Sequence, residues 1–176
     1  MRTLKSLLTL PVAFMLVACQ SAPNNPITTV ERVDLERFMG DWYVIASIPT
    51  FIEKDAFNAM ESYRLDDDGT VATTFKFNKG SLDGPLKQYN PRGFIRDKQS
   101  HAVWDMQFFW PFKAEYRIIF LNEAYSQTVI GRTKRDYVWI MARKKIIPEE
   151  EYANILNFLR EQDYDLKDLR VVPHDR

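Results

Sequence analysis

Eight short β-like runs followed by one amphipathic helix constrain this chain more than any other feature. The turn sequences Asp-Asp-Asp-Gly at 66–69, Asn-Lys-Gly at 78–80 and Asp-Gly at 83–84 separate several of the runs. Short strands at this spacing predict an antiparallel β-sandwich or β-barrel. The expected strands are residues 42–48, 59–65, 71–77, 88–96, 102–108, 115–121, 127–131 and 137–143.

Polar and apolar residues alternate within these runs. Thr74 and Lys76 are polar, whereas Phe75 and Phe77 are apolar. Successive side chains of a strand point to opposite faces, so each strand has one apolar and one solvated side.

The period changes to that of a helix over residues 148–162, where Tyr152, Ile155, Leu156 and Leu159 form a stripe. Pro148 and three following glutamates favour a helix start. We expect this helix to lay its apolar stripe on the outside of the sheet. A short helical turn is also expected at residues 34–39, with Asp34 as its cap.

Three motifs in order give the chain a family resemblance. Gly40 and Trp42 form a Gly-x-Trp motif on the first run, Asp136 and Tyr137 form an altered Thr-Asp-Tyr motif, and Arg143 ends the last run. With these motifs the chain resembles the lipocalin family over residues 33–172, and the bacterial outer-membrane subgroup in particular. The resemblance implies an all-β fold with one α-helix: an eight-stranded antiparallel up-and-down barrel with a C-terminal helix packed outside.

The motif residues are structural in that family. Gly40 can adopt backbone angles that other residues avoid, where the chain turns into the barrel. Trp42 is expected to plug the closed end, with Arg143 lying across its ring and gaining about 0.5–2 kcal/mol from cation–π attraction.

The N-terminus predicts export. Arg2 and Lys5 precede an apolar run at 7–17, which is shorter than the roughly 20 residues that a membrane-spanning helix needs. The ending Leu-Val-Ala-Cys resembles a bacterial lipobox, which implies lipidation of Cys19; a plain signal peptide with a chance cysteine is the alternative. Gln20 in the next position favours the outer membrane, with the protein facing the periplasm. We therefore expect a signal peptide at 1–18, a lipidated flexible tether at 19–32 and a lipocalin domain at 33–176.

Composition excludes several classes of function. Lys plus Arg and Asp plus Glu both number 24, and no basic cluster points to nucleic acid. Cys19 is the only cysteine, so a disulfide within the chain and cysteine chemistry in the barrel are both excluded. The two histidines, His101 and His174, do not form a metal-ligand pattern and offer no haem ligand. We expect no cofactor, no metal and no enzymatic activity.

An eight-stranded barrel can hold one small ligand. Because alternate residues of a strand point to the same face, the parity of each strand predicts which residues line the interior. A filled core made of the same residues is the alternative. The nominated lining is Val44, Ala46, Glu61, Tyr63, Phe75, Phe77, Trp104, Met106, Phe108, Tyr116, Ile118, Trp139 and Met141.

Glu61 is the unusual member of this set. A carboxylate inside an apolar cavity is costly unless it is paired or protonated. It could meet a cationic or amide head group, pair with an inward arginine, or lie in solvent if the register is shifted.

These features predict a membrane-tethered carrier or storage protein. The resemblance implies acyl lipids as cargo: fatty acids, lysophospholipids or phospholipids. A ten-carbon chain gains roughly 8 kcal/mol on burial before entropy costs. The alternatives are a structural lipoprotein without small-molecule cargo and, less favoured, a lipid-modifying enzyme.

Aromatic residues in one loop leave another question open. Phe109, Trp110 and Phe112 surround Pro111 at one end of the barrel. They could touch the membrane, guide lipid in, form a homodimer contact, or fold back as a lid.

Overall fold

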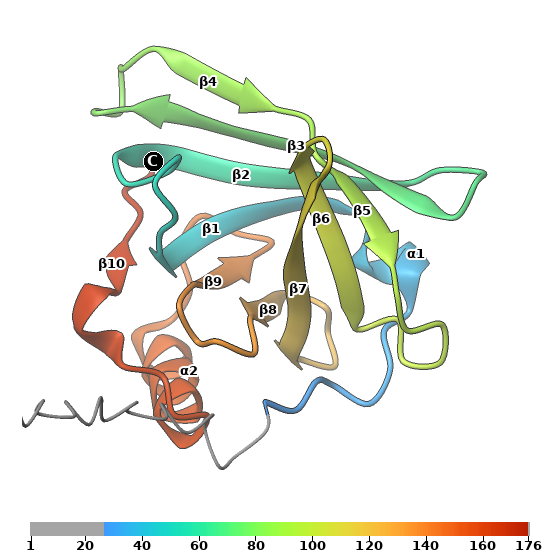
Figure 1. Cartoon of the computed structure of the whole chain (residues 1–176). Coiled ribbons are helices and arrows are strands. Elements are labelled where there is room, and N and C mark those ends of the chain that lie inside the picture. Colours follow the sequence, from blue (N-terminus) through green and yellow to red (C-terminus); the bar gives the residue numbers. More distant parts are fainter. Residues whose placement is uncertain (1–26, 176) are drawn as a thin grey trace, which may run out of the picture.

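An antiparallel sheet closed into a barrel forms the body of the protein, as Figure 1 shows for the computed structural model. The structure describes residues 27–175. Closure occurs because β1 (Gly40–Ile48) pairs with β2 (Ala56–Leu65) on one side and with β9 (Val138–Ala142) on the other. The remaining barrel strands are β3 (Thr70–Lys79), β4 (Leu86–Tyr89), β5 (Arg92–Ile95), β6 (Val103–Phe109), β7 (Phe112–Leu121) and β8 (Gln127–Gly131).

The predicted eight-stranded antiparallel barrel is confirmed, with one change in the fourth strand. The run expected at 88–96 is divided into β4 and β5, which both pair with β3. Pro91 lies between them and has no N–H to donate to the sheet ladder. Its carbonyl still accepts a hydrogen bond from the Thr73 amide at 3.1 Å, so the two pieces together fill one strand position.

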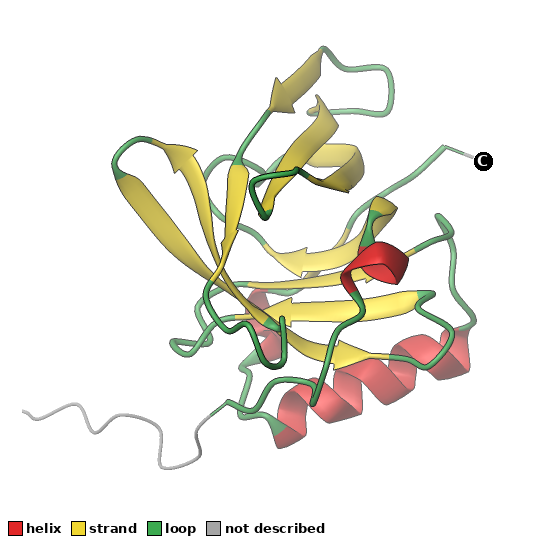
Figure 2. Cartoon of the chain, turned by 90° about the vertical axis from the view of Figure 1, so that its right-hand side faces the viewer, coloured by secondary structure: helices red, strands yellow, loops and turns green. Residues whose placement is uncertain are grey.

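The predicted helix is α2 (Glu149–Glu161), which lies along the outside of the barrel in Figure 2. The predicted turn is α1 (Leu35–Phe38), capped by the Asp34 carboxylate, which accepts from the Arg37 amide at 3.2 Å. After α2 the chain forms a 3-10 turn, η1 (Leu166–Asp168), and then β10 (Arg170–Val171), which pairs with β1 outside the barrel closure.

Two hydrophobic clusters follow from this arrangement. The inner one fills the closed part of the barrel and includes Trp42, Val44 and Trp104. The outer one lies between the sheet and α2, where Ile155 and Leu159 are buried. The helix therefore contributes a second core without entering the barrel.

A β-bulge in β1 corrects one predicted side-chain direction. The register with β9 shifts between Val44 and Ala46, so the parity of the strand reverses there. Val44 belongs to the inner cluster, but Ala46 belongs to the outer cluster. Ala46 was predicted to line the barrel interior, and that prediction is wrong.

The motif residues close one end of the barrel. The Arg143 guanidinium carbon lies 3.8 Å from the centroid of the Trp42 ring, and its Nη2 donates to the Phe38 carbonyl at 3.0 Å and to the Met39 carbonyl at 2.8 Å. Gly40 has φ +92°, and a Cβ there would lie 3.4 Å from Arg143 Nη1. The family motif is thus a structural plug.

Residues that precede α1 pack on the barrel from Ile27 onward. Ile27 is buried in the outer cluster, and the Val30 amide donates to the Ile118 carbonyl at 3.0 Å. The sequence predicted a tether up to residue 32, whereas these residues are held against the barrel. The predicted signal peptide and Cys19 lie outside the described residues. Within residues 27–175, no helix has the length and apolar character needed to span a bilayer.

Candidate functional site

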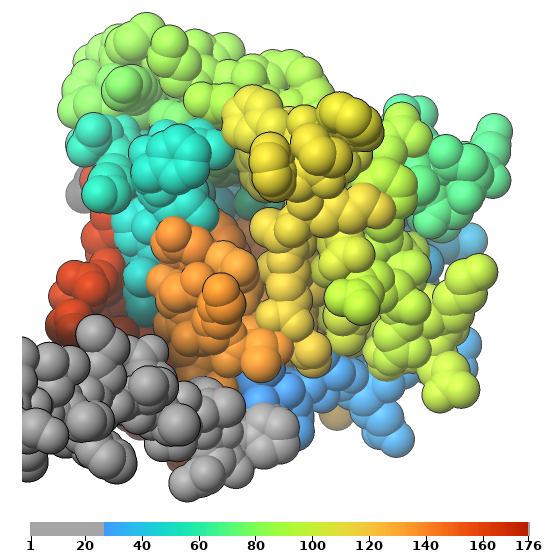
Figure 3. All heavy atoms as spheres, viewed as in Figure 1, coloured from blue at the N-terminus to red at the C-terminus, as the bar shows by residue number. Residues whose placement is uncertain are grey.

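A cavity of about 260 Å³ opens at the end of the barrel opposite the Trp42 plug. Figure 3 shows a recess between the cyan segment after β1, the orange segment before β9 and the yellow β6–β7 hairpin. The residues that line it are Thr50, Phe51, Ile52, Glu53, Glu61, Phe75, Met106, Phe108, Phe109, Phe112, Lys113, Ala114, Glu115, Tyr116, Arg132, Tyr137 and Trp139.

Strand parity nominated part of this lining. Glu61, Phe75, Met106, Phe108, Tyr116 and Trp139 were predicted from the sequence, and all line the cavity. Their side chains come from five strands, β2, β3, β6, β7 and β9.

Other nominated residues lie in the inner cluster rather than at the cavity. Large aromatic rings stack there: the Trp104 and Tyr116 centroids are 5.1 Å apart, and Phe38 contacts Trp104 at 5.6 Å. This packing fills the closed half of the barrel, so the cavity occupies only the open half. The residues concerned are Val44, Tyr63, Trp104, Ile118 and Met141. Phe77 also belongs to the inner cluster, but it lies beyond Phe75 on β3, and its ring centroid is 5.2 Å from that of Phe75 and 6.3 Å from that of Tyr89 on β4.

Loops and the adjoining ends of β6 and β7 supply the lining residues that strand parity did not nominate. Phe51, Ile52 and Glu53 come from the β1–β2 loop, and Arg132 follows β8. An apolar pair in a loop, as at Phe51 and Ile52, is a signal that sequence reasoning could have used. Glu53 and Arg132 carry no such signal, because their direction depends on how the loops fold over the opening.

Glu61 faces the interior, so the possibility of a register shift is wrong. It is 8% exposed and accepts a hydrogen bond from the Tyr63 hydroxyl, which in turn is 2.8 Å from the Tyr116 hydroxyl. Burial raises the pKa of Glu61 to about 7, although the Tyr63 hydrogen bond opposes the shift. Burial also raises the pKa of both tyrosines well above 10, so they remain neutral donors.

Glu53 places a second buried carboxylate in the same cavity, at 6% exposure. Its oxygens accept from the Thr50 amide and hydroxyl, both at 3.0 Å, and from the Trp139 indole N–H at 3.0 Å. Burial raises the pKa of Glu53 despite these donors. These hydrogen bonds hold the β1–β2 loop against β9 at the mouth.

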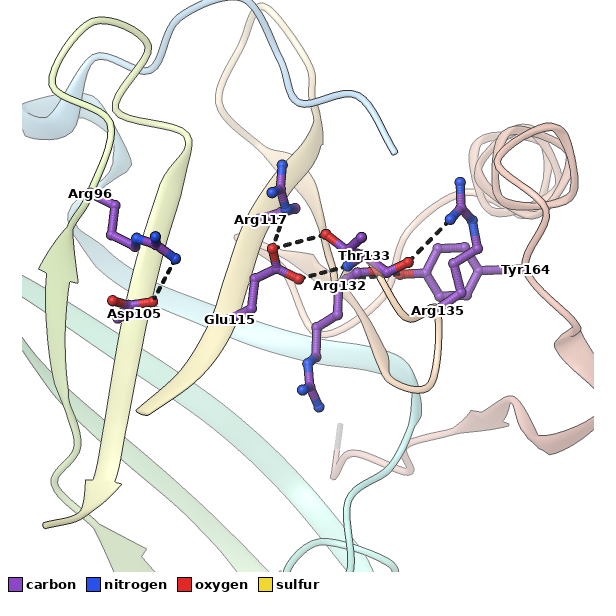
Figure 4. Close-up of polar contacts among 8 residues, drawn as sticks. All are labelled: Arg96, Asp105, Glu115, Arg117, Arg132, Thr133, Arg135 and Tyr164. Atoms are coloured by element: carbon purple, nitrogen blue, oxygen red, sulfur yellow. Dashed lines mark hydrogen bonds and ion pairs between the residues drawn. The ribbon is translucent and has the colours of Figure 1, made fainter. Parts of the chain in front are cut away.

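The opposite rim carries the motif loop. Glu115 binds Arg117 and Thr133, while the Arg132 side chain extends away from that group in Figure 4. Arg132 Nη1 lies 3.2 Å from the Asp136 carboxylate, and its guanidinium lies 5.2 Å from the centroid of the Tyr137 ring. Asp136 and Tyr137 therefore position the arginine that lines the mouth.

Exposed aromatic rings surround the opening. Trp110 is 85% exposed, and Phe51, Phe109 and Phe112 are also largely exposed. The β6–β7 loop thus does not fold back as a closed lid, which removes one of the four roles considered for it.

Comparison with known proteins agrees with this geometry. A family model described as a lipocalin-like domain matches residues 33–174. The chain is 29% identical over 169 residues to the outer membrane lipoprotein Blc of Escherichia coli K12, covering 94% of each chain. It is 26% identical to apolipoprotein D of Macaca fascicularis, covering 92% of this chain and 85% of that protein.

Solved structures support the same fold. Insecticyanin from the tobacco hornworm Manduca sexta superposes with a TM-score of 0.68 at 14% identity, covering 86% of each chain. The cockroach allergen Per a 4 gives a TM-score of 0.63 at 16% identity, covering 88% of this chain and 96% of that one. The chain therefore belongs to the lipocalin family, as a Blc-like member of a group of small-hydrophobic-ligand carriers rather than enzymes.

Proposed function

We propose that this lipocalin carries or stores an acyl lipid without covalent attachment, with the hydrocarbon chain in the cavity and the charged head group at the mouth. The observation that supports this most is a cavity lined largely by aromatic and aliphatic side chains. Burying hydrocarbon there gains about 0.8 kcal/mol per CH₂, which suffices for binding after the entropy cost is subtracted.

The size of the cavity favours a ligand with one chain. Its volume of about 260 Å³ lies just below the range of roughly 300–1,000 Å³ that is usual for sites of drug-sized ligands. A fatty acid or a lysophospholipid fits this space better than the two chains of a phospholipid.

Arg132 is the residue we assign to the head group. It lines the mouth, and its Asp136 ion pair leaves further N–H donors on the guanidinium. A carboxylate or phosphate is the natural partner of such a group.

The location of the protein is part of the proposal. Lipidation of Cys19 would hold the barrel on the periplasmic face of the outer membrane, next to its source of lipid. The relatives that are named outer membrane lipoprotein Blc include those of Escherichia coli K12 and Citrobacter freundii. The exposed rings of Phe51, Trp110 and Phe112 would face that lipid surface or the second copy in a homodimer.

Mass spectrometry of co-purified lipid tests the proposal. The barrel closes within residues 27–175, so a chain that starts at Gln20 is suitable. We expect close to one acyl chain per barrel after organic extraction. Ala114→Trp, which places a bulky ring at the mouth, should purify with much less lipid. Protein that is repeatedly empty and also ignores added dodecanoate and lysophospholipid would contradict the proposal.

A further inference from the structure

The inner end of the cavity carries a carboxylate that is incompletely satisfied. Glu61 lies opposite Trp42 of the closing plug on one side and Phe75 on the other. Between residues 27 and 175, the hydrogen bond from the Tyr63 hydroxyl is the one that reaches its carboxylate, and no ion pair includes it. A buried carboxylate of this kind calls for a donor from a ligand, because buried charges are normally paired.

Glu53 does not provide the donor that the Glu61 carboxylate lacks. Its own oxygens are occupied by Thr50 and Trp139, and its negative charge raises the pKa of Glu61 further. The two acids therefore repel any anionic group that enters the cavity deeply.

The positive charge of the cavity lies at its other end. Arg132 lines the mouth with a side chain that is 19% exposed, and its buried Nε has no hydrogen-bond partner in the described chain. Lys113 also belongs to the rim, but its ammonium lies 3.6 Å from the centroid of the Phe94 ring instead of over the opening. Glu61 is thus the acid at the floor of the cavity, whereas the mouth carries Arg132 together with the hydrogen-bonded acids Glu53 and Glu115.

We propose that the same cavity also takes single-chain amphiphiles with an ammonium head group, which enter head first and pair with Glu61. The inference rests on the proposed lipid-carrier function, because it uses the same hydrocarbon-binding space. Glu53 and Glu115 at the mouth already accept hydrogen bonds from protein donors, whereas Glu61 at the floor accepts only from Tyr63 within the described residues. An ammonium therefore pairs with Glu61, and an amine binds in the orientation opposite to that of a fatty acid. A phosphate next to the ammonium would be repelled by the Glu61 carboxylate, which restricts the class to amines that carry no adjacent anion.

Calorimetric titration with matched ligands tests this specificity. Dodecylamine, dodecanol and dodecanoate share one chain length and differ in head group, and lysophosphatidylethanolamine adds a phosphate to the ammonium. We expect the wild-type chain from Gln20 to bind dodecylamine at least tenfold tighter than dodecanol at pH 7.5. Lysophosphatidylethanolamine should show no such preference over lysophosphatidylglycerol.

Glu61→Gln should remove the preference for the amine, so that dodecylamine and dodecanol bind this variant with affinities within about threefold of each other. Glu36→Gln is the matched control, since Glu36 is exposed on α1 at the closed end and loses the same charge. Its affinities should equal those of the wild type.

Each result decides between the two proposals. Equal binding of amine and alcohol, or a preference that survives in Glu61→Gln, overturns the ammonium site and leaves the lipid carrier intact. Failure of all the single-chain ligands to bind overturns the carrier function itself.

A pH series on the wild type keeps the test independent of how the variant folds. The titratable groups around Glu61 are Tyr63 on its own strand, Tyr116 on β7 and Glu53 in the β1–β2 loop, while Arg132 lies at the mouth. Dodecylamine should bind more tightly as the pH rises from 6 to 8 and Glu61 ionises, whereas dodecanol should not. An amine affinity that is flat over this range contradicts the site.

Discussion

Arg143 shows at the level of one residue how the family motif works. Its guanidinium covers the Trp42 ring and donates to the carbonyls of Arg37, Phe38, Met39 and Asp41 at 2.8–3.0 Å. Lysine has a point charge and no planar fork, so it cannot replace this set of hydrogen bonds.

Replacing Arg143 by alanine should therefore destabilise the barrel strongly. We expect a loss of about 3 kcal/mol, because several charged hydrogen bonds and the cation–π contact disappear together. Urea unfolding followed by tryptophan fluorescence measures this loss. Arg143→Lys should fall between the wild type and the alanine variant. A loss of unfolding free energy below about 1 kcal/mol would show that Arg143 does not hold the closed end of the barrel together.

Glu61 makes the stability of the protein depend on pH. Its pKa is raised from 4.5 to about 7, so between these values the native chain holds a proton that the unfolded chain has released. Stability should then fall as the pH rises through this window, by about 3 kcal/mol in total. Glu61→Gln should flatten this part of the curve, measured by unfolding at pH 4.5, 6 and 7.5. A wild-type curve parallel to that of the variant would contradict the burial of an ionisable Glu61.

At the scale of elements, α2 and the barrel share the outer cluster. Leu159 is completely buried against the outside of the sheet, while the cavity lies on the inside. The sheet separates the two, so packing under the helix and ligand binding should be separable.

Leu159→Ala should cost about 2–5 kcal/mol through the cavity it leaves under α2. Dodecanoate affinity should change little while the protein is folded. Asn154→Ala on the exposed side of the same helix is the control and should change stability by less than about 0.5 kcal/mol. Thermal unfolding and calorimetry on the same samples check both parts, and a large loss of affinity in Leu159→Ala would contradict the separation.

For the whole molecule, a filled cavity should stabilise the closed barrel by linkage. A ligand at 100 times its Kd adds about 2.7 kcal/mol. For a chain of 176 residues this corresponds to a rise in Tm of roughly 5–11 °C. Differential scanning calorimetry with dodecanoate measures the rise, and Ala114→Trp should show little of it. An equal rise in both proteins would place the ligand outside the cavity.

The sequence by itself determined the strand order, the closing motif and the outer helix. A repeat of two residues in a strand or 3.6 residues in a helix is a local property of the sequence. The alternation around Phe75 and the apolar stripe that includes Leu159 can therefore be identified without knowing the fold. The sequence also showed that Glu61 lies on the same face of its strand as Tyr63, which points into the barrel.

Tertiary structure alone decided how much of the barrel is hollow. Trp104 and Tyr63 share the parity of the cavity residues, yet they pack with Phe38 at the closed end. The bulge after Val44 turned Ala46 outward, and loops brought Glu53 and Arg132 to the opening. These outcomes depend on side-chain volumes that meet across distant strands and on loop paths, and neither is encoded in the pattern of any one segment.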